Sequence, residues 1–244
     1  YRYHPLWIKA SQEEKFGHLV EFEKTLPKIR RKIQKDLSLP GLSRQKVMAA
    51  VVWLLENTLI RIGNEEYEKE NKSYGLTTLK NRHVNIYATN IRFQFKGKSG
   101  VYHNLSIKNK KVAGIIRRCK ELPGQDLFEY LDEQKVVQTV SSGDINEYLK
   151  QITGEEITAK DFRTWGATNL SSKILYAFGD AENKIALQKN VRQVVKEVAN
   201  HLNNTVGVCR NYYIHPTVIK TYSKKLLIPY FDLQKKTKPN FGLT

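Results

Sequence analysis

Cysteine is scarce in this sequence, which contains only Cys119 and Cys209 among its 244 residues. Two cysteines cannot build a disulfide framework, and neither has the neighbours of a metal-ligand motif, so we expect two reduced thiols, as in cytosolic proteins. The six histidines form no H-x-x-x-H pair, and no acidic cluster has the pattern of a metal site. The sequence therefore predicts no bound metal.

Long apolar runs and nucleotide-binding glycine motifs are absent as well. No run of about 18 apolar residues occurs, so we expect no transmembrane helix. Residues 1–7 lack the apolar region of a signal peptide. The chain has neither a P-loop nor a G-x-G-x-x-G motif, so we expect no nucleotide cofactor.

Positive charge is the strongest feature of the composition. Lysine and arginine number 41 against 24 aspartates and glutamates, which gives a net charge of +17, and 40% of the residues are hydrophobic. The length suits one large domain or two small ones, and the hydrophobic fraction is enough for a core. The charge favours a polyanionic partner, either nucleic acid or an acidic membrane surface.

Helical periodicity covers most of the chain. We predict an extended segment over residues 1–10 and helices over 11–36, 110–122 and 185–202. A further helix is predicted to begin after Ser43, a good capping residue.

The helix after Ser43 keeps its apolar positions at helical spacing as far as Ile62. Gly63 is a typical end signal. Arg61 is therefore predicted to lie on the last turn of this helix.

The middle of the sequence changes to the period of a strand. Apolar and polar residues alternate over residues 84–87, 91–95 and 101–107, which predicts a small antiparallel sheet. Residues 97–100 form a glycine-containing hairpin loop between the last two strands. The loop would project Lys98.

Two segments, beginning at Ser141 and Thr158, fit the S/T-x-x-D/E pattern of a helix start. The second predicts a helix that runs through Arg163 towards Phe178, with Lys160 in its first turn. Further on, Asn203-Asn204 ends a helix, a short helical turn leads to Tyr213, and Pro216 suits the first turn of the next helix.

Phosphodiester transfer by side chains alone has three requirements. A nucleophile must attack phosphorus, cations must hold the non-bridging oxygens, and an acid must protonate the departing oxygen. Tyrosine, arginine and lysine suit these tasks in turn. Taken singly, though, a lysine or arginine in so basic a chain is a solvated charge or a phosphate anchor, and one of 13 tyrosines is a core residue. Residue types alone establish no active site.

The sequence contains five motifs in order, within a resemblance that runs over residues 1–218: Arg61-Ile-Gly-Asn-Glu-Glu-Tyr67, Ser73-Tyr-Gly-Leu-Thr-Thr-Leu79 with His83, Phe95-Lys-Gly-Lys-Ser-Gly100 with His103, Asp161-Phe-Arg-Thr-Trp-Gly-Ala167, and Val208-Cys-Arg-Asn-Tyr-Tyr-Ile-His-Pro216. Together they resemble the catalytic domain of type IB DNA topoisomerases, in particular the small bacterial and poxvirus forms. The resemblance implies a mainly α fold with a small antiparallel β-sheet (α+β), the catalytic core of DNA breaking-rejoining enzymes.

The resemblance implies specific roles for individual residues. Tyr213 matches the nucleophile that joins the 3′ phosphate of a nicked strand, and Tyr212 stands where the family usually has a small residue. Arg61 and Arg163 match the two arginines that clamp the scissile phosphate. Lys98 matches the hairpin lysine that protonates the 5′ hydroxyl leaving group.

Position 204 departs from many family members, which have a histidine there that donates to a phosphate oxygen. Asn204 can still donate through its amide without carrying charge, and the bacterial branch also has asparagine at this place. His201, about one helical turn earlier, is the alternative donor. We expect Asn204 to complete the catalytic set.

Four further residues are expected to contact DNA: Lys160, Lys96, Tyr67 and Arg210. The resemblance also implies double-stranded DNA as the partner, no cofactor, a monomeric enzyme, and a location in the bacterial cytoplasm, at the nucleoid. Residues 1–80 and 81–220 are predicted to form one catalytic domain, followed by a basic tail over 221–244. The sequence begins without methionine, and we expect the N-terminal β-rich clamp domain of such enzymes to be missing, which would weaken DNA binding.

Two rival interpretations stay open. A tyrosine recombinase would share the fold and the nucleophile, but its helix usually carries H-x-x-R, whereas Lys160 holds the first of these positions before Arg163. A non-catalytic basic DNA-binding module would bind DNA without forming a covalent adduct.

Overall fold

The computed structural model describes residues 5–237, with side chains from Phe16 to Lys236. The chain divides into two compact units. The sheet unit is Glu21–Arg163, and the helical unit combines Tyr1–Val20 with Thr164–Thr244. The divisions fall inside two long helices, α1 (Pro5–Asp36) and α6 (Ala159–Phe178), so each of these helices belongs in part to both units.

Helix α1 begins at Pro5, so the predicted extended segment is wrong from residue 5 onward, and residues 1–4 lie outside the described residues. Proline suits a helix start because the N–H that it lacks would have no helical partner there. Within the sheet unit, α1 buries an apolar stripe at helical spacing: Phe22, Leu26, Ile29 and Ile33.

Helix α2 (Arg44–Thr58) starts directly after Ser43, as predicted, but it ends well before Gly63. Leu59 closes it in a left-handed conformation (φ 52°) and donates its N–H to Leu55. The prediction that Arg61 lies on the last turn is therefore wrong. The carbonyls of Arg61 and Ile62 instead accept hydrogen bonds from η1, the short turn that begins at Leu76.

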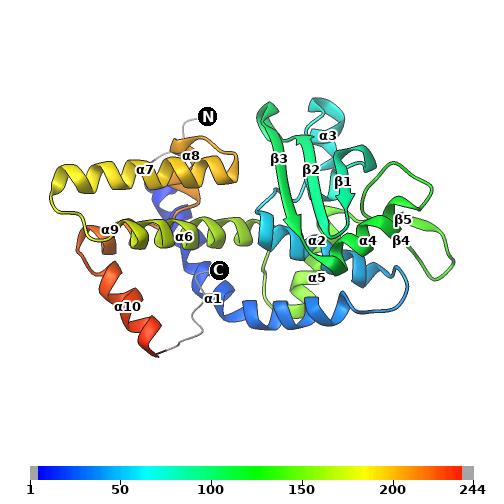
Figure 1. The fold of residues 1–244 in the computed structure, drawn as a ribbon, viewed down its shortest axis with the longest axis horizontal. Helices are drawn as coiled ribbons and strands as arrows, with labels where there is room; N and C mark the ends of the chain where they lie inside the picture. Colours follow the sequence, from blue (N-terminus) through cyan, green and yellow to red (C-terminus); the bar gives the residue numbers. More distant parts are fainter. Residues whose placement is uncertain (1–4, 238–244) are drawn as a thin grey trace. The chain divides into compact units, whose positions relative to one another are not determined.

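The predicted sheet is confirmed. Strands β1 (Val84–Tyr87), β2 (Asn90–Lys96) and β3 (Tyr102–Lys108) pair antiparallel in the order β1-β2-β3, side by side in Figure 1. Alternate residues of β2 face the core, where Ile91, Phe93 and Phe95 are buried. Helix α4 (Lys110–Lys120) packs against β2. The hairpin between β2 and β3 contains a short 3₁₀ turn, η3 (Lys98–Gly100).

Several short elements of the sheet unit were not predicted. They are α3 (Glu65–Asn71), η1 (Leu76–Thr78), η2 (Asn81–His83), β4 (Glu129–Leu131) and β5 (Val137–Thr139). Helix α5 (Ser142–Thr153) begins with the predicted capping box, in which Ser141 and Asp144 bond reciprocally. At the start of α6 the Asp161 carboxylate accepts from the backbone N–H and the hydroxyl of Thr158, and the Asp161 N–H donates to the Thr158 backbone carbonyl.

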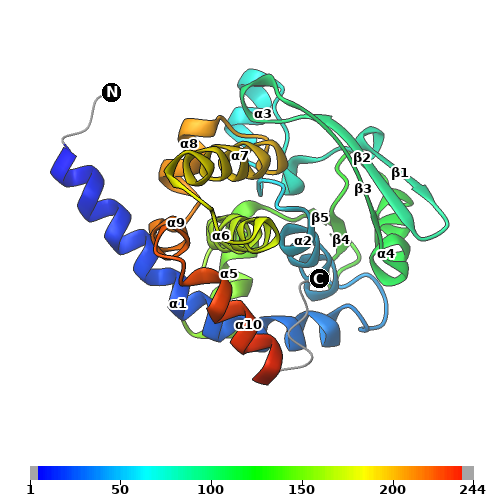
Figure 2. The same cartoon turned by 60° about the vertical axis from the view of Figure 1, so that its left-hand side comes forward.

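The helical unit consists of parts of α1 and α6 together with α7 (Lys184–Leu202), α8 (Val206–Tyr212), α9 (Pro216–Ser223) and α10 (Leu227–Thr237). Figure 2 shows α8 beside α7, with which it packs. Pro216 occupies the first turn of α9, as predicted. No helix among the described residues is long and apolar enough to cross a bilayer.

The segment predicted as a basic tail contains ordered structure that packs within the helical unit. Tyr222 in α9 is fully buried, and its hydroxyl donates to the Gly179 carbonyl at 2.8 Å. Leu227 and Phe231 in α10 are buried as well. Residues 238–244 of that segment lie outside the described residues. The overall class, mainly α with small antiparallel sheets, is as predicted.

Candidate active site

Arg163 lies in the first turns of α6, where the Thr158–Asp161 cap fixes the start of the helix. Its side chain is buried (4% exposed), and Nη1 donates to the Leu59 carbonyl at the end of α2. A buried cation of this kind is held in one place, so Arg163 joins the beginning of α6 to the loop that carries Arg61.

The backbone around Arg61 is fixed by a close approach of two glycines. A Cβ on Gly75 would lie 2.5 Å from the Gly63 Cα and 2.6 Å from the Arg61 carbonyl oxygen, and Gly63 itself has φ +111°. The Leu76 N–H donates to the Arg61 carbonyl at 2.9 Å, and the next N–H, that of Thr77, donates to the Ile62 carbonyl. Glycine is therefore required at both positions, and η1 holds the Arg61 loop in place.

His103 is a buried histidine whose pKa responds to both Arg61 and Arg163. It is buried on β3 (4% exposed), stacks on Phe95 with ring centroids 4.5 Å apart, and lies against Gly97, where a Cβ would be 2.6 Å from Nε2. Burial lowers the pKa of His103 to about 4, and the positive charges of Arg61 and Arg163 act in the same direction. The imidazole is therefore neutral at pH 7, with both arginines within electrostatic reach.

His103 was not among the predicted site residues. The pairing of the hairpin could have pointed to it, because Phe95 and His103 lie directly opposite each other on β2 and β3. The period-2 pattern places both side chains on the buried face of the sheet.

Lys98 lies on the hairpin turn, exposed to solvent, as predicted. Its Nζ is 5.2 Å from the centroid of the Tyr67 ring on α3, a cation–π geometry. Lys96 and Lys160 are also exposed, so both are accessible to a phosphate backbone. The sheet unit therefore contains two arginines beside a neutral histidine, and it contains Lys98 against an aromatic ring.

Tyr213 and Asn204 belong to the helical unit. Tyr213 ends α8 and is half-buried, and its carbonyl accepts from the Thr168 hydroxyl of α6 at 3.1 Å. The same hydroxyl oxygen accepts from the His215 N–H at 3.0 Å, so Thr168 fixes the turn on both sides of the tyrosine. Sequence reasoning missed Thr168. Asn204 follows the left-handed end of α7 and donates its backbone N–H to Ala199.

The remaining predicted residues of the helical unit are exposed. His201 lies near the end of α7, and Arg210 lies on α8. His215 is half-buried and caps α9 by accepting from the Thr217 N–H at 3.0 Å. Among the described residues, no group of three or more histidine, cysteine, aspartate or glutamate side chains could hold a metal ion.

The catalytic core of eukaryotic DNA topoisomerase I is the family that matches residues 6–238, and this chain belongs to that family. The match covers nearly every described residue, including Arg61, Lys98, Arg163, Asn204 and Tyr213.

Curated relatives include viral and eukaryotic DNA topoisomerases. The DNA topoisomerase 1B of Acanthamoeba polyphaga mimivirus is 30% identical over 97% of this chain and 71% of its own length. The DNA topoisomerase 1B of vaccinia virus (strain Copenhagen) is 29% identical over 77% of this chain and 57% of its own length. DNA topoisomerase 1 of Daucus carota is 28% identical over 65% of this chain and 20% of its own length. These relatives are viral and eukaryotic, so they do not support the expected bacterial origin.

A solved XerH site-specific recombinase, bound to its difH substrate in a pre-cleavage complex, covers 81% of this chain and 52% of its own length. Its TM-score is 0.44 at 10% sequence identity, and a likeness at that level carries no argument.

Proposed function

We propose that this chain is the catalytic domain of a type IB topoisomerase, which relaxes supercoiled duplex DNA through a transient single-strand nick. The observation that carries the proposal is that the buried Arg163 bonds to the Leu59 carbonyl, two residues before Arg61, and that both arginines act on the buried His103, in a chain of this family. Two guanidinium groups can hold the non-bridging oxygens of a phosphodiester as charge builds up in the transition state.

In the proposed reaction, the Tyr213 phenol releases its proton to solvent water, and its oxygen forms a bond to phosphorus while the bond from phosphorus to the 5′ oxygen breaks. Arg61 and Arg163 stabilise the phosphoryl oxygens, and Asn204 donates a further hydrogen bond. Lys98 gives its proton to the departing 5′ oxygen. Religation is the reverse, in which the 5′ hydroxyl attacks the 3′-phosphotyrosyl ester and the tyrosine leaves.

The proposed reaction needs no ATP, because the energy of the cleaved bond is not lost. One phosphodiester is exchanged for another, so the bond energy is kept in the tyrosyl ester while the free end rotates. The arginines supply positive charge at the phosphate, so we also propose that no metal ion is required. We further propose that the chain acts as a monomer in the cytoplasm and holds DNA mainly by its phosphates.

The experiment that tests the function uses a suicide duplex, in which the strand beyond the cleavage site is too short to stay bound. In EDTA and without ATP, the proposal predicts a protein–DNA adduct that survives denaturation, and relaxation of a plasmid with no special sequence. Tyr212→Phe, which removes the neighbouring exposed hydroxyl, is the matched control for Tyr213→Phe. DNA binding without any adduct would establish the non-catalytic module, and strict dependence on paired recognition sequences would establish the recombinase.

A further inference from the structure

Helix α3 is a short acidic helix in a strongly basic protein. It has seven residues, with Glu65, Glu66 and Glu68 in its first turn. All of α3 lies within the described residues, and none of its side chains is buried. A helix this short does not persist by itself, and this one has no apolar side chain anchored in the core. Its position therefore depends on polar contacts.

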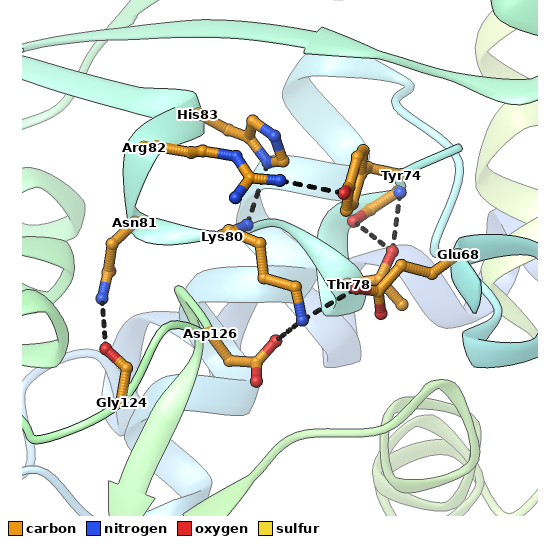
Figure 3. A network of polar contacts seen from close by, with 10 residues as sticks. Glu68, Tyr74, Thr78, Lys80, Asn81, Arg82, His83, Gly124 and Asp126 are labelled. Atoms are coloured by element: carbon orange, nitrogen blue, oxygen red, sulfur yellow. Dashed lines mark hydrogen bonds and ion pairs between the residues drawn. The ribbon is translucent and has the colours of Figure 1, made fainter. Parts of the chain in front are cut away.

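Lys80 provides that contact. Its Nζ is 2.9 Å from Oε1 of Glu68 on α3 and 2.7 Å from Oδ1 of Asp126. Figure 3 shows the Lys80 side chain between these two carboxylates. The Lys80 side chain is only 18% exposed, so the two ion pairs are partly shielded from water. Burial lowers the pKa of Lys80, but the hydrogen bonds to Asp126 and Glu68 outweigh burial and raise it above its ordinary value.

The segment that carries Lys80 is itself firmly held. The Lys80 N–H donates to Nδ1 of the buried His83 at 3.0 Å, and residue 80 forms an isolated β-bridge with Asp126. On either side of the bridge, the Leu127 N–H donates to Leu79 at 2.8 Å and the Asn81 N–H donates to Gln125 at 2.9 Å. Lys80 thus connects a short helix without buried residues to a segment that several backbone hydrogen bonds hold.

Helix α3 in turn lies next to the candidate acid. Tyr67 precedes Glu68 directly, and its ring lies 5.2 Å from the Lys98 ammonium. The chain that leaves α3 also bonds to the base of the hairpin, because the Tyr74 N–H donates to the Lys96 carbonyl at 2.8 Å. A displacement of α3 would therefore remove the aromatic support of Lys98.

We infer that Lys80 is a positioning residue for Lys98: its pairing with Glu68 fixes α3, and α3 holds the Tyr67 ring against the Lys98 ammonium. The inference rests on the proposed function, in which Lys98 delivers a proton to the 5′ oxygen. Lys80 touches neither DNA nor the reacting atoms in this scheme. It sets where the proton donor stands when the phosphorus–oxygen bond breaks.

The test compares Lys80→Met with Asp126→Asn, a matched control that breaks the other ion pair of Lys80 and leaves the pair with Glu68. Single-turnover cleavage is measured on a duplex with the normal 5′ oxygen and on one with sulfur in its place. Sulfur leaves as a thiolate, so it needs no proton from Lys98. Lys80→Met should slow cleavage of the oxygen substrate by about tenfold, because the donor is misplaced, and should cleave the sulfur substrate within about twofold of the unchanged protein.

Glu68→Gln should reproduce the Lys80→Met pattern, the double variant should be no worse than either single one, and Lys80→Arg should restore the rate. The inference is overturned if Lys80→Met slows both substrates equally, or if Asp126→Asn gives the same defect.

Two controls separate this inference from the proposed function. If Lys98→Ala is not rescued by the sulfur substrate, the acid role of Lys98 fails, whatever Lys80 does. Hydrogen exchange of the α3 amides in the free protein needs no activity at all. It should become faster in Lys80→Met and Glu68→Gln and stay unchanged in Asp126→Asn, and unchanged exchange in Lys80→Met would contradict the tether.

Discussion

At the scale of single residues, two buried histidines stay neutral in a protein of high positive charge. Burial lowers the pKa of both His83 and His103 to about 4. His103 also has Arg61 and Arg163 near it, and a protonated imidazole would repel both. The resemblance to a family pointed to the arginines from sequence, but their proximity to His103 depends on the strand register and on the turn after α2, which no local pattern reveals.

The low pKa of His103 predicts how stability changes with pH. Below about pH 6.5 the unfolded chain protonates this histidine, whereas the folded protein resists protonation until about pH 4, so the free energy of unfolding falls with pH across this window. At pH 4.5 the loss from this one group is about 2–3 kcal/mol. His103→Gln should therefore lose less stability than the unchanged protein between pH 7 and pH 4.5 in urea unfolding. If the free energy of unfolding falls equally in the two proteins over this range, the low pKa of His103 is contradicted.

At the scale of elements, alternation and capping motifs predicted much of the fold. The three strands of the sheet and the helix starts after Ser43, Ser141 and Thr158 were predicted from local patterns, because each depends on nearby residues alone. The end of α2 was wrong, because Gly63 serves the close contact with Gly75 instead of closing the helix. Strands β4 and β5 have three residues each, which is too short for a period to be detected.

The contact between Gly63 and Gly75 predicts a sharp difference between two glycine substitutions. Gly75→Ala would force a methyl group to within 2.5 Å of the Gly63 backbone, so we expect it to lower the free energy of unfolding by about 2–4 kcal/mol. Gly114→Ala is the matched control, because nothing lies within 4 Å of its Cβ position in the interior of α4. It should raise stability by about 0.5–1 kcal/mol. Equal effects of the two substitutions in urea unfolding would show that the Arg61 loop can move aside.

At the scale of the whole molecule, the net charge of +17 is the property that composition alone revealed. It indicated a polyanionic partner without saying which one, and membership of the topoisomerase family supports the proposal of DNA. The five predicted catalytic residues divide between the units, with Arg61, Lys98 and Arg163 in the sheet unit and Asn204 and Tyr213 in the helical unit. Their individual roles stay predictions, because they rest on resemblance.

The charge predicts DNA binding that weakens steeply with salt. A protein that contacts six to ten phosphates loses about 10³- to 10⁵-fold in affinity between 50 and 200 mM salt. Lys160→Gln should make the slope of log affinity against log salt shallower by about one, since it removes one expected phosphate contact. Lys150→Gln removes an exposed lysine that is already paired with Glu156, and it should leave the slope unchanged. Identical slopes for all three proteins would remove Lys160 from the DNA interface.

The most direct test of the central claim is to map the residue that carries the nucleotide after cleavage of the suicide duplex. Trypsin digestion of the trapped adduct should yield a nucleotide-linked peptide, Asn211–Lys220, which contains both Tyr212 and Tyr213. Fragmentation of this peptide by mass spectrometry distinguishes the two. The account predicts the nucleotide on Tyr213, with no adduct in Tyr213→Phe. A nucleotide on Tyr212 or on any other residue, or an adduct that persists in Tyr213→Phe, would contradict it.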